Sequence, residues 1–135
     1  MTDFKEYFKF PLRMWENFSI KVFTSDNKMA FDWLIDTTVE SKQKLLDRIN
    51  GIDSTPYKVA KEYWHHDGII YCKLLSGQRA GKEFKLCRIR GWGMLTGVGG
   101  YALDSREASC IQDNFAEYCV KMLNGDKNKD PLINK

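Results

Sequence analysis

The chain has 135 residues, of which 43% are hydrophobic, and its 21 Lys and Arg against 18 Asp and Glu give a formal net charge of +3. This length supports one hydrophobic core and excludes two ordinary domains, so we expect a single domain over residues 1–125. The charge lies below the strongly basic balance of dedicated nucleic-acid binders. No apolar run reaches the roughly 18 residues that span a bilayer, and the opening MTDFKEYFKF lacks the basic end and aliphatic stretch of a signal peptide. We therefore expect a cytoplasmic protein without a membrane partner.

In the candidate N-terminal arm, residues 1–16, four aromatic side chains at near-helical spacing precede Pro11. This pattern is typical of a short helix or of an extended arm, because proline ends a helix. Exposure of four aromatic side chains to water is unfavourable, so two interpretations are possible for Phe4, Tyr7, Phe8 and Phe10. Either they cover the edge of the sheet within the chain, or they form an association surface for a second copy or another protein.

Residues 18–35 predict a β-hairpin, because apolar and polar residues alternate along two runs. The polar sequence TSDNK between the runs supplies the turn. One face of each strand is expected to carry the apolar residues Phe18, Ile20 and Val22, then Phe31, Trp33 and Ile35.

Residues 37–51 predict an amphipathic helix. Thr37 and Glu40 have the spacing of a capping box, and Gly51 supplies a residue that adopts positive φ at the helix end. The expected apolar side consists of Val39, Leu45, Leu46 and Ile49.

Residues 56–64 fit either a helix that begins after Thr55 or a strand, and we favour the strand. Two clearer strands follow at GIIYCKLL and KEFKLCRIR, joined by the turn SGQRAG. The positions expected in a core or an interface are Tyr71, Cys72, Phe84, Leu86 and Ile89.

The most regular element is the helix expected from Asp104 to Gly125, which Asp104 and Glu107 begin as a capping box. One helical face repeats the apolar residues Ala108, Ile111, Phe115, Tyr118, Cys119 and Met122. Residues 126–135 have little to bury and predict a disordered tail. The order β-β-α-β-β-β-α predicts an α+β fold, in which an antiparallel sheet of about five strands carries two helices on one face.

The chain offers little for metal binding or catalysis. Its four cysteines fall in apolar patterns without a C-x-x-C pair and predict buried free thiols: Cys72, Cys87, Cys110 and Cys119. His65 and His66 do not complete a zinc site with them, because the spacing matches no familiar finger and adjacent strand residues point to opposite faces. No serine or cysteine elbow accompanies the histidines. We therefore predict neither a metal nor a cofactor, assign no catalytic residue, and favour a binding function over an enzymatic one.

A glycine-rich stretch, RIRGWGMLTGVGG, precedes the last helix. Backbone N–H groups of such turns can form a concave anion site, with Arg88 and Arg90 adding charge. In the alternative, structural interpretation, Gly97 and Gly99 adopt positive φ where the chain passes from strand to helix, and Trp92 closes the end of the core. We favour the structural interpretation, because the spacing of phosphate-binding loops is missing and an acid already caps the following helix.

Positive charge concentrates between Tyr57 and Gly91, where eight basic residues accompany three acidic ones. Aromatic residues are interleaved with the bases, and a single-stranded nucleic-acid site uses this mixture for phosphate pairing and base stacking. A sheet with an aromatic core face and a lysine-coated solvent face gives the same pattern without a ligand. For this pattern alone we favour the ligand-free sheet. If the surface binds a ligand, a nucleotide or nucleic acid is the one expected. The candidate ligand-binding residues are Trp64, Lys85, Arg88, Arg90, Trp92, Gly97 and Gly99.

The order α-β-β-β-α over residues 37–124 resembles the double-stranded RNA-binding fold. That family contacts phosphates with basic residues at the start of its last helix, where this chain has DSREAS. The resemblance is therefore limited to topology.

The run RGWGMLTGVGGYALDSREASCIQDNFAEYCVKMLN resembles part of small uncharacterised proteins from phages and mobile elements of gut bacteria. The resemblance is confined to the C-terminal third of the chain. It implies an accessory role in a bacterial cytoplasm, such as interference with host defence, and it implies no reaction and no site residues. We expect a non-enzymatic binding protein for an anionic ligand, with binding of a host protein or a second copy through the N-terminal aromatics as the alternative.

Overall fold

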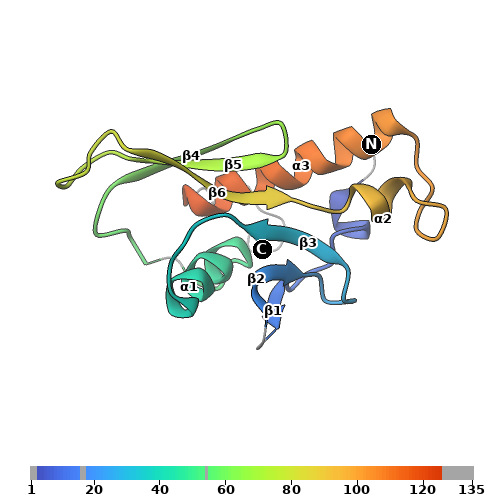
Figure 1. Cartoon of the computed structure of the whole chain (residues 1–135), viewed down its shortest axis with the longest axis horizontal. Helices are drawn as coiled ribbons and strands as arrows, with labels where there is room; N and C mark the ends of the chain where they lie inside the picture. Colours follow the sequence, from blue (N-terminus) through green and yellow to red (C-terminus); the bar gives the residue numbers. More distant parts are fainter. Residues whose placement is uncertain (1–2, 16–17, 54, 126–135) are drawn as a thin grey trace.

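The computed structural model describes residues 3–15, 18–53 and 55–125. One sheet of six antiparallel strands, in the order β1-β2-β3-β6-β5-β4, forms its centre (Figure 1). The strands are β1 (Arg13–Trp15), β2 (Phe18–Phe23), β3 (Met29–Trp33), β4 (Lys61–His66), β5 (Ile69–Leu74) and β6 (Glu83–Ile89). The antiparallel α+β architecture confirms the sequence prediction. The expected count of about five strands is one short, because β1 has only three residues and its alternation is too brief to detect.

Two three-stranded meanders make up the sheet. β1, β2 and β3 follow one another, as do β4, β5 and β6, and the meanders join at the centre where β3 pairs with β6. Phe31 lies opposite Ile89 in this pairing, and Trp33 lies opposite Cys87. The chain between β3 and β4 must therefore cross from the middle of the sheet to its far edge, and it carries α1 (Val39–Ile49) on the way.

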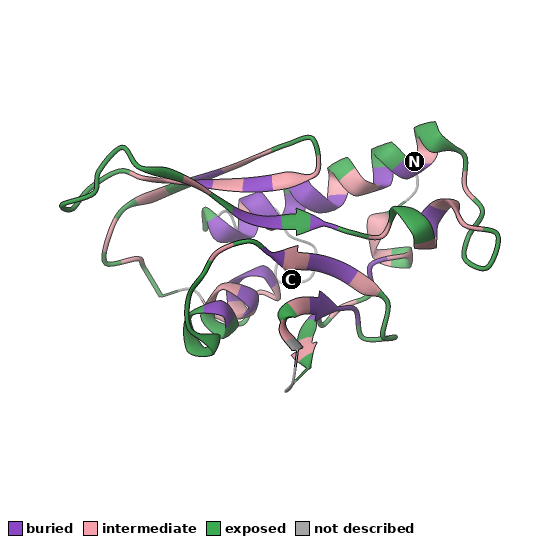
Figure 2. Ribbon diagram, in the orientation of Figure 1, coloured by how far each residue is buried: buried purple, intermediate pink, exposed green. Residues whose placement is uncertain are grey.

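The two faces of the sheet differ in what covers them. The long helix α3 (Ser105–Leu123) packs against β4, β5 and α1. Figure 2 shows buried residues where β3, β5, β6 and α3 come together. Val22 and Phe31 have no exposed surface, whereas their strand neighbours Lys21 and Asp32 lie on the opposite face, which no described helix covers. We call this second face the open face.

The N-terminal aromatics pack inside the molecule. The segment forms a 3-10 helix, η1 (Phe4–Glu6), against α3. Phe8 stacks on Phe115 with ring centroids 4.2 Å apart, and the rings of Phe4 and Phe10 lie 5.8 and 6.2 Å from the same ring. Phe8 is fully buried, and Phe4, Tyr7 and Phe10 are partly buried against the core. These contacts favour the interpretation in which the aromatics cover the core within the chain and remove part of their apolar area from water.

The two long helices begin at side-chain caps. Asp104 accepts the N–H of Glu107 at 2.8 Å, as predicted for the start of α3. At α1 the cap is Thr38 rather than Thr37, and its hydroxyl accepts the N–H of Ser41. The prediction was shifted by one residue because either of two adjacent threonines can cap, and sequence spacing does not show which one adopts the extended backbone that a cap requires.

Each long helix ends in an Asn-Gly pair whose asparagine fastens the helix to an edge of the sheet. Asn50, at the end of α1, accepts the N–H of Leu12 and donates to its carbonyl, both at 2.8 Å. Asn124, at the end of α3, makes the same two bonds with Tyr63 of β4, at 2.9 and 3.0 Å. The glycines that follow have φ of 81° and 87°, which glycine adopts without strain. We call these paired contacts the asparagine clamps.

Several local predictions change at their boundaries. The strand favoured over residues 56–64 is confirmed from Lys61 onward, and the chain before it is irregular. Ile20 and Val39, which were expected on apolar faces, are exposed. Val39 is the first residue of its helix, where the apolar stripe has not yet reached α3. The tail predicted for residues 126–135 lies outside the described residues.

Replacing Phe115 with alanine should lower the free energy of unfolding by about 3 to 5 kcal/mol, because the fully buried ring would leave a cavity under α3. Urea denaturation monitored by circular dichroism measures this. Val98→Ala is the control, and it should leave the midpoint unchanged because Val98 is 96% exposed. A Phe115→Ala midpoint equal to wild type would contradict the packing of α3.

Asn50→Ala should cost about 1 to 3 kcal/mol of unfolding free energy, because it removes two hydrogen bonds and leaves the buried N–H of Leu12 unpaired. Asn114→Ala is the matched control, since that side chain donates only a weak 3.8 Å contact to the Cys110 sulfur. The same denaturation assay compares them. Equal losses in the two variants would show that water replaces the clamp.

Candidate functional site

A pocket of about 1220 Å³ opens where β6 extends beyond β3. β3 ends at Trp33 opposite Cys87, whereas β6 begins at Glu83, so the first residues of β6 have no strand beside them on that side of the described sheet. The loop after β3, α1, Asp53, residues 55–58 and the turn between β5 and β6 enclose the space. The pocket is thus bounded by the connection that crosses the sheet.

The lining of the pocket is strongly basic. Among its 21 residues, eight are Lys or Arg and only two, Asp36 and Asp53, are acidic. The bases come in pairs from four segments: Lys44 and Arg48 from α1, Lys58 and Lys61 from the entry to β4, Arg79 and Lys82 from the turn between β5 and β6, and Lys85 and Arg88 from β6. A cleft lined by one sign of charge raises the local concentration of ligands of the opposite sign. The pocket therefore favours an anion.

A second hollow, of about 570 Å³, continues the pocket toward the turn between β5 and β6. The two share Lys58, Lys61, Arg79 and Phe84. Together they form one continuous basic surface that extends from α1 to the turn between β5 and β6. An extended polyanion, whose charges repeat along a chain, fits such a surface better than a small compact ion does.

The open face carries an aromatic pair beside the pocket. Trp64 of β4 lies opposite Tyr71 of β5, and Tyr71 lies opposite Lys85 of β6. The rings of Trp64 and Tyr71 stack with centroids 5.6 Å apart and planes 10° apart, and both residues are partly exposed. Because Lys85 also lines the pocket, this cross-strand row joins the aromatic pair to the basic lining.

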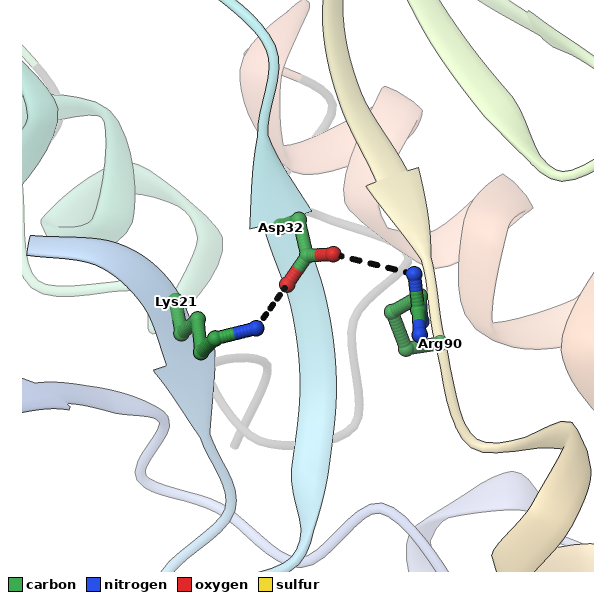
Figure 3. A network of polar contacts seen from close by, with 3 residues as sticks. All are labelled: Lys21, Asp32 and Arg90. Carbon is green, nitrogen blue, oxygen red and sulfur yellow. Dashed lines mark hydrogen bonds and ion pairs between the residues drawn. The ribbon is translucent and has the colours of Figure 1, made fainter. Parts of the chain in front are cut away.

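Arg90 is held by a contact within the fold. Its guanidinium donates to Asp32 Oδ2 at 3.2 Å, and Lys21 Nζ lies 3.7 Å from Asp32 Oδ1 (Figure 3). The three side chains extend across β2, β3 and the end of β6 on the open face. One carboxylate between two cations neutralises part of their charge. Arg90 therefore stands apart from the pocket lining.

The glycine-rich stretch forms α2 (Trp92–Thr96) and a turn whose N–H groups bond within the chain. The N–H of Gly97 donates to the carbonyl of Gly93, and those of Gly100 and Ala102 donate to the carbonyl of Gly97. An anion site of the nest type needs N–H groups that are available to the ligand. The hydrogen bonds of this turn favour the structural interpretation.

Two details of that interpretation need correction. Neither Gly97, with φ of −70°, nor Gly99 has positive φ; the glycine of this stretch that does is Gly91, at 124°. Gly97 is required for a different reason, because a Cβ there would lie 2.3 Å from the carbonyl oxygen of Gly93. Trp92 does not close the core: it is 41% exposed, and Leu95, one helical turn later, is the buried residue.

Two tyrosines line the pocket without adding negative charge. Burial raises the pKa of Tyr57 above its ordinary value, although the nearby charge of Arg48 opposes the rise. Burial also raises the pKa of Tyr63, with Tyr57 as a further cause. Both phenols stay protonated at neutral pH, so neither neutralises the lysines and arginines around them.

The cysteines do not assemble into a site. Cys72, Cys87 and Cys119 are buried free thiols, as predicted, and burial raises the pKa of each. The prediction is wrong for Cys110, which is exposed because it lies one position outside the buried stripe of α3. Within the described ranges, no group of three or more His, Cys, Asp and Glu could hold a metal ion.

The residues that the sequence singled out for ligand binding are divided between two ends of the sheet. Lys85 and Arg88 line the pocket, and Trp64 belongs to the adjoining aromatic pair. Arg90 is bound on the open face, and Trp92 and the glycines after it lie at the α2 end, outside the pocket lining. The structure thus brings the basic strand residues together and separates the glycine-rich turn from them.

Sequence reasoning missed the contribution of α1. Lys44 and Arg48 line the pocket, and Arg48 is only 7% exposed. A signal was present, because Arg48 follows Leu45 by three residues and so lies beside the apolar stripe of the helix. A basic residue at a helix position beside the apolar stripe indicates a charged side chain that lies close to the protein interior.

No family model, curated protein or solved structure matches the chain. Across the ranges that the structure describes, no helix has the combination of length and apolar character needed to cross a bilayer. The function is therefore argued from the pocket and the open face.

Gly97→Ala should lower the free energy of unfolding by about 1 to 3 kcal/mol, because the new methyl group meets a backbone oxygen that cannot move away cheaply. Gly99→Ala is the matched control in the same turn. A Cβ at Gly99 has no atom within 4 Å, so this variant should unfold like wild type. Thermal denaturation of the two variants makes the comparison, and equal midpoints would contradict the steric account of the turn.

Proposed function

We propose that the protein binds single-stranded nucleic acid, with phosphates along the pocket and the adjoining hollow and with bases on Trp64 and Tyr71. The observation that carries the proposal is the set of eight basic residues against two acidic ones around one pocket. Phosphates attract such a surface because binding releases the counterions condensed on the strand. The two adjoining hollows extend over several elements, from α1 to the turn between β5 and β6, which is compatible with a chain of phosphates.

The aromatic pair favours a single strand over a duplex. Unpaired bases stack on aromatic side chains, whereas the bases of a duplex are already stacked on one another. Trp64 and Tyr71 lie in one cross-strand row with Lys85, so a base on the rings would place the adjacent phosphate near a lysine of the pocket. Stacking tolerates every base, and we expect little sequence preference.

Binding without reaction accords with the residues at hand. The described lining of the pocket contains no histidine or cysteine, the residues that most often act as general bases or as strong nucleophiles. On the resemblance of the C-terminal third alone, we extend the proposal to an accessory role in a phage or mobile element. An accessory protein of a phage or mobile element would meet nucleic acid as a ligand.

Fluorescence anisotropy with a labelled dT12 oligonucleotide tests the proposal. The double variant Lys58→Gln, Lys85→Gln removes two pocket charges and should weaken binding at least tenfold, with a shallower salt dependence of affinity. The double variant Lys9→Gln, Lys28→Gln is the control, because it removes the same charge from exposed positions outside both hollows. It should change affinity by less than about threefold, as expected for distant screened charges.

Tyr71→Ala adds a test of stacking. It should weaken binding of dT12 by about tenfold, within the range of about 1 to 3 kcal/mol per stacked base, and leave the affinity for a duplex of the same length unchanged. Failure of wild type to bind dT12 at low salt would contradict the proposal. Equal losses in the two lysine double variants would show attraction by net charge alone.

A further inference from the structure

The pocket contains a nearly buried charge that has no counterion. Arg48 is 7% exposed, and no described residue forms an ion pair or a side-chain hydrogen bond with its guanidinium. Buried charges in proteins are normally paired, because removal of an ion from water is costly. Arg48 instead lies over the ring of Tyr57, with its Cζ 3.9 Å from the ring centroid.

A second cation shares this ring. Lys61 Nζ lies 4.5 Å from the centroid of Tyr57, and all three residues line the pocket. The ring attracts cations through its quadrupole but carries no net charge. Neither phenol of the lining supplies an anion, since both remain protonated. The carboxylate of Asp53 lies near enough to raise the pKa of Tyr57, but it forms no ion pair with Arg48. Arg48 and Lys61 therefore place two positive charges around one neutral ring, and a bound anion would balance them.

We infer that Arg48 and Lys61 bind a phosphate monoester at the end of the nucleic-acid strand. This inference rests on the proposed function. The guanidinium presents a planar set of donors that matches two phosphate oxygens, which an ammonium group cannot do. A terminal monoester carries up to two negative charges and three acceptor oxygens, more than the single charge of an internal phosphodiester.

The burial of Arg48 selects a strand end over an internal phosphate. A phosphodiester within the strand carries a nucleotide on each side, so both nucleotides would have to enter the space beside Tyr57. A terminal phosphate reaches the guanidinium with one nucleotide behind it. The rest of the oligonucleotide can then extend outward along the basic residues of the pocket, past Lys58 and Arg79, into the adjoining hollow.

Three dT6 oligonucleotides test the inference: one with a 5′-phosphate, one with a 3′-phosphate and one with hydroxyl groups at both ends. Wild type should bind one phosphorylated form at least tenfold more tightly than the hydroxyl form, and the comparison identifies which end is bound. Arg48→Met keeps the length of the side chain without its charge and should reduce this ratio to about one. Lys44→Met is the matched control, because Lys44 lies on the same helix and lines the same pocket but is exposed. It should weaken all three oligonucleotides equally and preserve the ratio.

The stability of the ligand-free variant separates this role from a structural one. Arg48→Met removes an unpaired buried charge, so its thermal midpoint should equal or exceed that of wild type. A large fall in the midpoint would show that Arg48 serves the fold and would overturn the inference. Arg48→Lys provides a second variant that retains the charge. It should still bind the hydroxyl oligonucleotide, with a phosphate preference reduced severalfold because the ammonium lacks the planar donor set.

The outcomes distinguish this inference from the proposed function. Equal affinity of wild type for the three oligonucleotides would overturn the terminal phosphate site and leave single-strand binding in place. An unchanged phosphate preference in Arg48→Met would overturn the role of Arg48 alone. Absence of binding to all three oligonucleotides would overturn both proposals.

Discussion

The rest of the structure depends on one topological constraint, which is that the chain must cross from β3 at the middle of the sheet to β4 at its edge. Three strand spacings of about 4.8 Å separate these strands. The connection makes the crossing with α1 and, among the described residues, 50–53 and 55–60, at the end where β3 stops and β6 extends further. It encloses a space beside β6 instead of a further layer of core. Basic residues from the connection and basic residues from β6 therefore line the same pocket.

Direct contacts connect the hydrophobic core to the helix that lines the pocket. The stacked rings of Phe8 and Phe115 hold the N-terminal segment on α3, and the hydroxyl of Tyr118 donates to the carbonyl of Ile49 at 3.1 Å, which ties α3 to the end of α1. The residue before Ile49 is Arg48. Its position in the pocket is thus set by the same contacts that assemble the core.

The elements that could be predicted from the sequence are those with a long, regular pattern. The buried face of α3 and its cap at Asp104 have that regularity, and so do the clearer strands. β1 was missed because a three-residue strand has no detectable period, and its pairing depends on contacts distant in sequence. For the site, the basic strand residues Lys85 and Arg88 were found by charge pattern alone. Arg48 was missed because only the crossing of the sheet brings α1 beside β6, and that proximity is not encoded in local spacing.

The asparagine clamps have a chemical consequence for the ageing of the protein. An asparagine followed by glycine is open to attack by the glycine nitrogen, because glycine has no side chain to hinder the approach. The glycine nitrogen bonds to the side-chain carbonyl carbon, which closes a succinimide ring and releases ammonia. Water then opens this ring and leaves a carboxylate in place of the carboxamide. At Asn50 that change would replace the donor that meets the Leu12 carbonyl with an acceptor, and at Asn124 it would do the same to Tyr63. Deamidation would thus loosen both edges of the sheet. In the folded protein the N–H of Gly51 donates to the carbonyl of Arg48 and that of Gly125 to the carbonyl of Met122, so the attack should proceed mainly in protein that has unfolded.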